Sequence, residues 1–262
     1  MKTCEYATVV ENKRLTKDVY SIILKTKISK NAKPGQFVTL YSDDESRLLP
    51  RPISIADFDR NLRTLRLVYR VVGEGTKEFS EKASGDTLKV MGPLGNGYPE
   101  YKEYGKVLLV GGGVGIPPLL AKAKELHETG CKKEDIVVIL GYRSKDDIFL
   151  REEFEEIATT YITTDDGSVG FKGNTVEFAR TLEDEFDVIY SCGPKIMLSS
   201  LKKYAEEKAT TLYVSLEERM ACGIGACLAC TCNSTEVDGH TNVKKKRTCV
   251  DGPVFDAKEV EI

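Results

Sequence analysis

The sequence has no tryptophan, only two histidines, and no apolar run long enough to cross a bilayer. The scarcity of histidine excludes metal sites built from several imidazoles, so a metal would depend mainly on sulfur ligands. A formal net charge of −3 over 262 residues gives no electrostatic reason to expect a nucleic-acid or membrane-surface partner. The one basic run, Lys244–Arg247, is short and typical of a solvated loop or of a patch for an acidic partner. Because residues 1–6 show no basic-then-apolar leader pattern, we expect a cytoplasmic protein.

Residues 1–100 carry short apolar or alternating runs separated by turn residues such as Lys33-Pro34-Gly35. This spacing is typical of a small antiparallel β barrel. The runs that we expect to form strands are Ala7–Val10, Val19–Leu24, Gln36–Leu40, Leu65–Val72 and Thr87–Val90.

Residues 101–216 change to an alternation of buried strands and amphipathic helices, which predicts an α/β domain with a parallel sheet. Its expected strands are Val107–Val110, Ile136–Leu140, Asp187–Ser191 and Leu212–Leu216, and its helices lie near Pro117–Glu128, Leu150–Ala158 and Lys195–Lys208. Residues 217–262 are too few and too aperiodic to build a core of their own, so we expect a metal to hold this third domain together.

Five of the eight cysteines fall between Cys222 and Cys249. Cys222, Cys227 and Cys230 have the C-x4-C-x2-C spacing of a plant-type [2Fe–2S] site, and Cys249 supplies a fourth thiolate. Gly223 and Gly225 would let the loop turn sharply, exposing amides that can hydrogen-bond to cluster sulfurs.

Structural zinc is the alternative for these cysteines, but zinc more often uses two C-x2-C knuckles. Here only Cys227 and Cys230 form one, so the spacing favours iron and sulfide. Cys232 could be a spare ligand if the chain is extended from Cys230, and is otherwise a buried bystander thiol.

Two segments of the first hundred residues offer groups for a phosphorylated, ring-bearing cofactor. In Leu49–Ser54 (LPRPIS), Arg51 could bind a diphosphate and Ser54 a polar ring edge, while Gly75–Thr76 could present amides to a phosphate. Each feature alone is weak, since an arginine in a strand usually faces solvent and Gly-x-Gly usually forms a turn.

A glycine-rich segment, Val110–Pro118 (VGGGVGIPP), joins a predicted buried strand to a predicted helix. Glycines permit close approach of the backbone, and a helix N-terminus attracts a pyrophosphate. The segment departs from the G-x-G-x-x-G fingerprint, because Ile116 stands where the last glycine belongs. Asp165–Ser168 could contact a ribose and favour NAD, although an acidic turn explains these residues equally well.

Together these motifs resemble the ferredoxin–NADP reductase superfamily. The resemblance implies an antiparallel FAD-binding barrel (residues 1–100), a parallel-sheet NAD-binding domain (residues 101–216) and a small [2Fe–2S] domain (residues 217–262). It implies that Arg51 binds the flavin pyrophosphate and that Ser54 lies near flavin N5. Ile53 departs from the family, which commonly has a stacking tyrosine there; Tyr69 could replace it or belong to the barrel core. The implied FAD residues are Arg51, Pro52, Ile53, Ser54, Val68, Tyr69, Arg70, Gly75 and Thr76.

The same resemblance covers Ser191–Pro194 (SCGP), where Cys192 would lie near the nicotinamide. A plain buried thiol is the other reading of this cysteine. The implied NAD residues are Gly111, Gly113, Gly115, Cys192, Gly193 and Pro194.

The order of the motifs, with the MACGIGACLAC loop last, resembles the electron-transfer subunits of NAD-dependent bacterial dihydroorotate dehydrogenases. This implies an FMN-bearing catalytic partner in a two-plus-two assembly, with electrons passing through [2Fe–2S] and FAD to NAD⁺ for pyrimidine synthesis. One alternative is a subunit of the NAD(P)H–ferredoxin oxidoreductase or sulfide dehydrogenase type, whose cluster loops commonly lack the first cysteine. The other is a non-enzymatic zinc-binding, nucleotide-sensing module.

Overall fold

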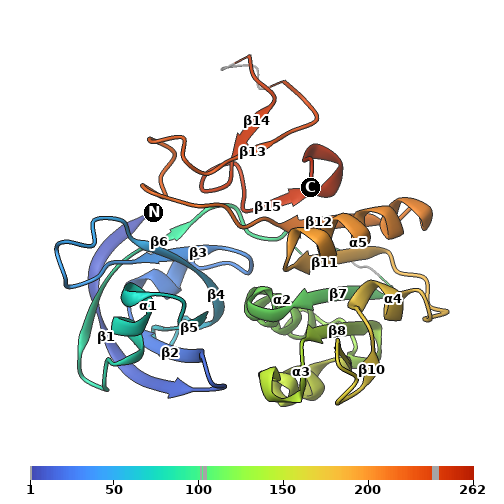
Figure 1. Cartoon of the computed structure of the whole chain (residues 1–262), viewed down its shortest axis with the longest axis horizontal. Coiled ribbons are helices and arrows are strands. Elements are labelled where there is room, and N and C mark those ends of the chain that lie inside the picture. Colours follow the sequence, from blue (N-terminus) through green and yellow to red (C-terminus); the bar gives the residue numbers. More distant parts are fainter. Residues whose placement is uncertain (1, 101, 103–104, 238–241) are drawn as a thin grey trace.

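The structure is a computed structural model that describes residues 2–100, 102, 105–237 and 242–262. The boundary predicted at residue 101 therefore lies outside the described residues. Figure 1 shows a barrel on one side, a sheet flanked by helices on the other, and the C-terminal segment lying across the end of both.

The N-terminal part is a closed antiparallel barrel with strand order β1-β2-β5-β4-β3-β6. Its interior is filled by the inward-facing residues of each strand, including Val9, Ile22, Leu40 and Leu67, all at most 1% exposed. This confirms the barrel expected from the short alternating runs. The elements are β1 (Thr3–Arg14), β2 (Val19–Lys25), η1 (Lys27–Asn31), β3 (Phe37–Leu40), β4 (Arg51–Asp59), β5 (Thr64–Arg70), α1 (Glu74–Ser80) and β6 (Thr87–Leu94).

The second part is a seven-stranded sheet with order β10-β9-β8-β7-β11-β12-β15, parallel except for β15. Its strands are β7 (Val107–Gly112), β8 (Ile136–Tyr142), β9 (Thr159–Thr164), β10 (Phe171–Lys172), β11 (Val188–Cys192), β12 (Thr211–Ser215) and β15 (Val254–Asp256). The helices and turns between them are η2 (Gly113–Gly115), α2 (Pro117–Glu128), η3 (Lys133–Asp135), η4 (Lys145–Asp147), α3 (Arg151–Ile157), α4 (Thr175–Ala179) and α5 (Lys195–Glu207).

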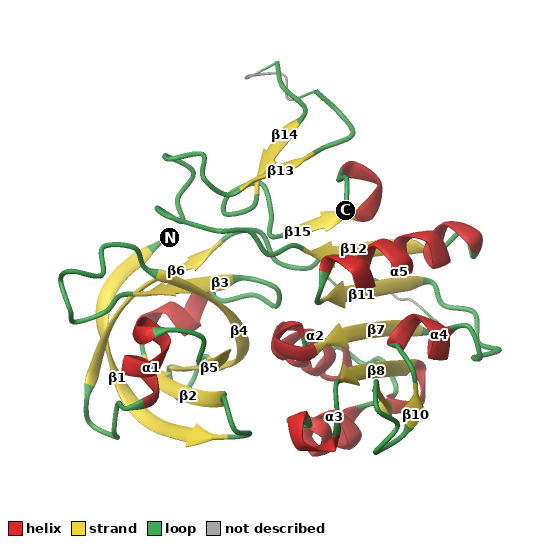
Figure 2. Cartoon of the chain, in the orientation of Figure 1, coloured by secondary structure: helices red, strands yellow, loops and turns green. Residues whose placement is uncertain are grey.

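Helices cover both faces of this sheet (Figure 2). α2 and α3 pack on the face that shares a hydrophobic core with Val19, Ala56 and Val68 of the barrel. α4 and α5 pack on the opposite face. The barrel and the sheet are therefore joined through a common core, which fixes how their ends meet.

The C-terminal segment is attached to both parts. It contains the hairpin of β13 (Thr231–Asn233) and β14 (Lys245–Arg247), then β15 and η5 (Ala257–Glu259). β15 pairs antiparallel with β12, with Phe255 opposite Val214, so this segment completes the sheet. In the described residues, no helix is long and apolar enough to span a membrane.

Candidate functional site

A cavity of about 330 Å³ opens where β4 begins and β5 ends. It is lined by almost the whole predicted flavin set: Arg51, Pro52, Ile53, Ser54, Val68, Tyr69, Arg70 and Thr76. The barrel brings these residues together because β4 and β5 are neighbours in its strand order. We call this space the flavin cavity.

Gly75 lies beneath the guanidinium group of Arg51. A methyl group at Gly75 would come within 2.8 Å of Nη2 of Arg51. The guanidinium can therefore occupy this position only because Gly75 has no side chain. Arg51 Nη1 also donates a hydrogen bond to the carbonyl oxygen of Leu49. A fixed guanidinium beside free space suits a diphosphate.

Tyr69 belongs to the barrel core and to the flavin cavity at once. Its ring is 2% exposed and lies edge-on to Phe79, with 6.3 Å between ring centroids. Its hydroxyl is buried without a hydrogen-bond partner among the described residues. Burial raises the pKa of this hydroxyl, with a smaller contribution from Tyr20, so it remains a donor. An unsatisfied buried donor beside the cavity fits a flavin with polar ring atoms.

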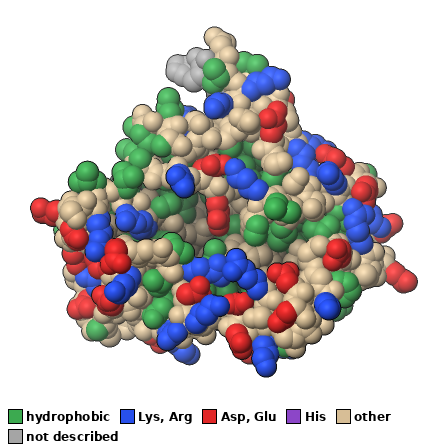
Figure 3. Space-filling view, in the orientation of Figure 1, with side chains coloured by type: hydrophobic (Ala, Val, Ile, Leu, Met, Phe, Trp, Pro, Cys, Tyr) green, Lys and Arg blue, Asp and Glu red, His purple; other side chains and the backbone are tan. Residues whose placement is uncertain are grey.

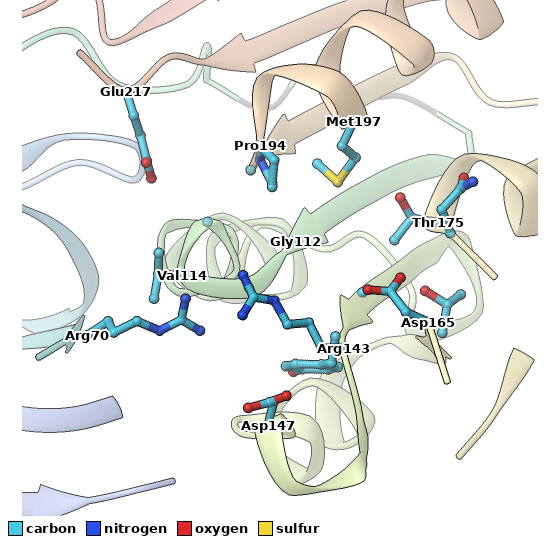
Figure 4. A pocket seen from close by; sticks show the side chains of 17 residues that line it. Arg70, Gly112, Val114, Arg143, Asp147, Asp165, Thr175, Pro194, Met197 and Glu217 are labelled. Atoms are coloured by element: carbon cyan, nitrogen blue, oxygen red, sulfur yellow. The ribbon is translucent and has the colours of Figure 1, made fainter. Parts of the chain in front are cut away.

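A second cavity, of about 460 Å³, lies at the carboxyl ends of β7, β8, β9 and β11 (Figure 4). The strand order reverses between β7 and β11, which is where open α/β sheets bind nucleotides. We call this space the nucleotide cavity. Of the predicted NAD residues, Gly113, Gly115, Gly193 and Pro194 line it, together with Gly112 and Val114.

The glycine loop can lie against β11 only because it lacks side chains there. A methyl group at Gly115 would come within 2.5 Å of the Cys192 carbonyl oxygen. The loop leads into α2, which begins with Pro117 and has no side-chain cap at its N-terminus. Pro117 and Pro118 carry no N–H, and the Leu119 amide donates to the Ile116 carbonyl oxygen. The helix therefore offers a pyrophosphate the positive end of its dipole rather than open amides of its first turn. Gly111 does not line the cavity; a methyl there would meet Ile116 at 2.8 Å, so Gly111 permits strand–helix packing.

Cys192 is 1% exposed and lines neither cavity. Burial, followed by the charge of Glu217, raises the pKa of its thiol, while a hydrogen bond with Ser215 lowers it. Ser215 itself lines the flavin cavity, so the thiol lies behind that hydroxyl. The role of Cys192 beside the nicotinamide stays a prediction.

Several residues that line the nucleotide cavity were missed in the sequence. Arg143 and Asp147 follow β8, and Thr163 comes from the end of β9. Arg143 directly follows the observed β8, which extends two residues beyond the strand predicted at Ile136–Leu140. Its place near the carboxyl end of a predicted strand could have revealed it. Of the proposed ribose contacts, Asp165 lines the cavity, whereas Asp166 accepts hydrogen bonds from the amide and hydroxyl of Ser168.

The cysteine loop lies against the barrel. Phe37 of β3 and Leu94 of β6 form one hydrophobic cluster with Cys230 and Cys249, and Met220 packs against it. Gly223 and Gly225 take positive φ values of 68° and 87°, as a sharply turning loop requires. The barrel therefore supports the loop on which the cysteines stand.

The predicted ligands come together as two pairs. Cys222 Sγ accepts hydrogen bonds from the amides of Ile224 (3.5 Å) and Cys227 (3.4 Å) and contacts the Cys227 thiol. Burial alone would raise the pKa of Cys222, but these amides and the Cys227 thiol lower it to about 6.

Cys249 forms the second pair with Cys230. Burial, and then the Cys230 thiol, raise the pKa of Cys249 to about 12. Two thiolates for each of two irons is the arrangement that a [2Fe–2S] cluster needs. Among the described residues, no three His, Cys, Asp or Glu side chains converge on one metal-sized point.

Cys232 points away from this loop. Cys230 precedes β13 rather than lying in it, so strand alternation does not relate the two side chains. Cys232 instead packs in the core beneath α5, and its thiol donates to the Lys246 carbonyl oxygen at 3.5 Å. The structure supports the bystander reading of this cysteine.

Comparison with known proteins identifies two stretches of the chain. Residues 217–261 match the iron–sulfur cluster binding domain of dihydroorotate dehydrogenase B, and residues 109–203 match the oxidoreductase NAD-binding domain. The electron transfer subunit of dihydroorotate dehydrogenase B (NAD(+)) from Fusobacterium nucleatum is 43% identical over 98% of both chains. The chain belongs to this family. The corresponding subunit from Streptococcus pneumoniae strain R6 is 41% identical over 96% of both chains.

Solved structures give the same fold. An NADH-dependent reduced ferredoxin-NADP oxidoreductase, described in work on flavin-based electron bifurcation, superposes with a TM-score of 0.86. It is 36% identical and covers 97% of this chain and 89% of its own. A flavohemoglobin from Malassezia yamatoensis with bound FAD has a TM-score of 0.69 and 20% identity, covering 80% of this chain and 59% of its own. That likeness shows the fold alone.

Proposed function

We propose that this chain is the subunit through which a dihydroorotate-oxidising partner passes electrons to NAD⁺ during pyrimidine synthesis. The observation that carries the proposal is that the cysteine loop, the flavin cavity and the nucleotide cavity are contiguous. Phe37 and Met220 line the flavin cavity and also pack with Cys230 and Cys249. On its other side, the flavin cavity meets the nucleotide cavity, and the two share lining residues. A module that only sensed a nucleotide would not require this continuity.

The residues present fit the three groups that the family implies. Cys222, Cys227, Cys230 and Cys249 would hold [2Fe–2S], the residues of the flavin cavity would hold FAD, and the glycine loop would bind NAD⁺. When bound, the cluster supplies one-electron transfer, and FAD joins two electrons and a proton into the hydride that NAD⁺ accepts. The chain's own part would be to neutralise the flavin diphosphate with Arg51, to donate from Ser54 and Tyr69, and to hold the three sites next to one another.

The test is to assay the purified, cofactor-loaded chain with and without its catalytic partner. Alone, it should reduce an artificial acceptor with NADH but should not turn over dihydroorotate. With the partner, dihydroorotate-dependent NADH formation should appear. Dihydroorotate turnover by the isolated chain would contradict the division of labour.

The surface beside the cysteine loop suits the catalytic partner. Leu48 is 83% exposed and lines a shallow groove with Leu49 and Met220. Ile224 and Leu228 of the cysteine loop are also exposed, by 45% and 57%. Exposed apolar side chains gather over this upper part of the barrel side in Figure 3. We infer that the FMN-bearing catalytic subunit covers this surface, in an assembly of two copies of each chain.

The second candidate, exchange of electrons with ferredoxin, is favoured by the likeness to the ferredoxin-NADP oxidoreductase. Cys222 argues for the first candidate, since the cluster loops of the ferredoxin-type relatives commonly lack this cysteine. Reduction of NAD⁺ by reduced ferredoxin, together with inactivity beside a dihydroorotate dehydrogenase catalytic subunit, would favour the second.

We propose that residues 1–100, 101–216 and 217–262 form the flavin, nucleotide and cluster domains, with β15 attaching the last domain to the sheet of the second.

We also propose a cytoplasmic location, which accords with a function that needs reduced thiols at Cys222, Cys227, Cys230 and Cys249.

A further inference from the structure

Glu217 stands where the flavin and nucleotide cavities meet. It follows β12 and lines both cavities, as do Arg70 from β5 and Val114 from the glycine loop. In Figure 4 its side chain hangs from the segment after β12 into the space between barrel and sheet, opposite Val114. A group that occupies this junction therefore lies beside the Glu217 side chain.

The carboxylate of Glu217 is not neutralised by the protein. In the part of the chain that the structure describes, no lysine, arginine or histidine forms an ion pair with it. Its neighbour Glu218 pairs with Lys195 at 2.6 Å, and Arg70 Nε lies 3.3 Å from Asp18 Oδ2. Glu217 reaches solvent within the cleft, yet lies deep enough for desolvation to raise the pKa of its carboxyl.

The other carboxylates of the nucleotide cavity lie away from the junction. Asp165 belongs to the end of β9, beside Thr175 in Figure 4, and Asp147 is 3.6 Å from Lys17. Glu217 is therefore the acidic group that faces whatever occupies the junction itself.

This inference rests on the proposed function, in which FAD passes a hydride to NAD⁺. That transfer determines which group occupies the junction. A hydride moves only between rings in near contact, about 3–3.5 Å apart. The nicotinamide must consequently enter the junction bounded by Arg70, Val114 and Glu217. This ring carries a positive charge in NAD⁺ and none in NADH.

We propose that Glu217 makes the junction discriminate between the oxidised and reduced nicotinamide. Its carboxylate attracts the cationic ring of NAD⁺ electrostatically, and no comparable attraction exists for the neutral ring of NADH. The adenine and phosphate parts are the same in both forms, so binding to the rest of the cavity does not discriminate. The residue thereby favours NAD⁺ as the bound substrate and NADH as the released product, the direction that dihydroorotate oxidation requires.

The test measures by anaerobic calorimetry the dissociation constant of NAD⁺ for the oxidised FAD-loaded holoprotein and that of NADH for the fully reduced holoprotein, pairings in which no net hydride transfer occurs. Both constants are compared between the wild type and Glu217→Gln. The Gln substitution should raise the dissociation constant of NAD⁺ roughly three- to tenfold and leave that of NADH within about twofold. Glu217→Asp, which keeps the charge, should retain most of the discrimination. Glu134→Gln, the same change on the exposed turn η3, should alter neither constant.

Equal weakening of both nucleotides by Glu217→Gln, or no change in either, would overturn the proposal, as would an Asp variant that behaves like the Gln variant. Failure of the wild-type holoprotein to bind either nucleotide would instead contradict the proposed function. The two failures are therefore distinguishable.

Discussion

At the scale of single residues, the contact between Gly75 and Arg51 decides how the flavin cavity is built. The two residues are far apart in sequence, and the barrel places the guanidinium where a Gly75 side chain would be. A displaced guanidinium would lose its charge-assisted hydrogen bonds to a diphosphate, while the fold would be unaffected because the Arg51 side chain is flexible.

Gly75→Ala should therefore weaken FAD binding roughly tenfold or more, since a hydrogen bond to a charged group contributes about 1.5–3 kcal/mol. Folding stability of the FAD-free chain should hold or rise slightly, because alanine is the better helix former. Flavin titration and thermal unfolding measure the two effects. Gly73→Ala is the matched control: φ at Gly73 is −173°, and an added methyl would meet nothing within 4 Å. Equal effects of both substitutions would contradict this role of Gly75.

At the scale of elements, the cysteine loop and the return through Cys249 form one metal-binding unit supported by β3 and β6. Cys232 belongs to a different core although it is only two residues from Cys230. Local spacing alone could not separate these two thiols.

Cys249→Ala should reduce iron and sulfide from about two each per chain to well below one, with loss of the cluster's visible absorption. FAD content and NADH-dependent reduction of an artificial acceptor should persist, because the flavin and nucleotide cavities are intact. Metal, sulfide and flavin analysis of protein purified without oxygen gives the answer. The control variant Cys232→Ala should keep the full cluster. Loss of the cluster in this variant would refute the assignment of ligands. Stoichiometric zinc without sulfide in the wild-type chain would favour the zinc-binding alternative.

At the scale of the whole molecule, barrel, sheet and cysteine loop are arranged so that electrons enter at one end and leave at the other. The loop with its exposed Leu228 lies beside the apolar groove of Leu48 and Leu49, whereas the nucleotide cavity opens between barrel and sheet. Partner and nucleotide can therefore bind at the same time.

Leu48→Glu should weaken association with the catalytic subunit roughly tenfold or more, because it places a charge in an apolar interface. NADH-dependent acceptor reduction by the free chain should be unchanged. Size-exclusion chromatography with light scattering measures the association and also the predicted two-plus-two stoichiometry. Leu62→Glu is the control, since Leu62 is 67% exposed on the turn after β4, at the end of that strand opposite Arg51. If Leu48→Glu associated normally with the catalytic subunit, the interface would have to lie elsewhere on the molecule.

The sequence by itself determined the features that depend on short-range chemistry. The helix predicted at Pro117–Glu128 has those bounds in the structure, because Pro117 suits a first helical turn and Gly130 an end. The cysteine spacing and the order of motifs along the chain likewise indicated the fold and the family.

Only the tertiary structure decided what depends on segments distant in sequence. β15 was not expected because three residues carry no periodic signal, and it is a strand because β12 offers an edge for Val254–Asp256. The junction is of the same kind: Arg70, Val114 and Glu217 come from a barrel strand, a glycine loop and the segment after β12. No local pattern marks them, since their meeting follows from how barrel and sheet pack around a shared core.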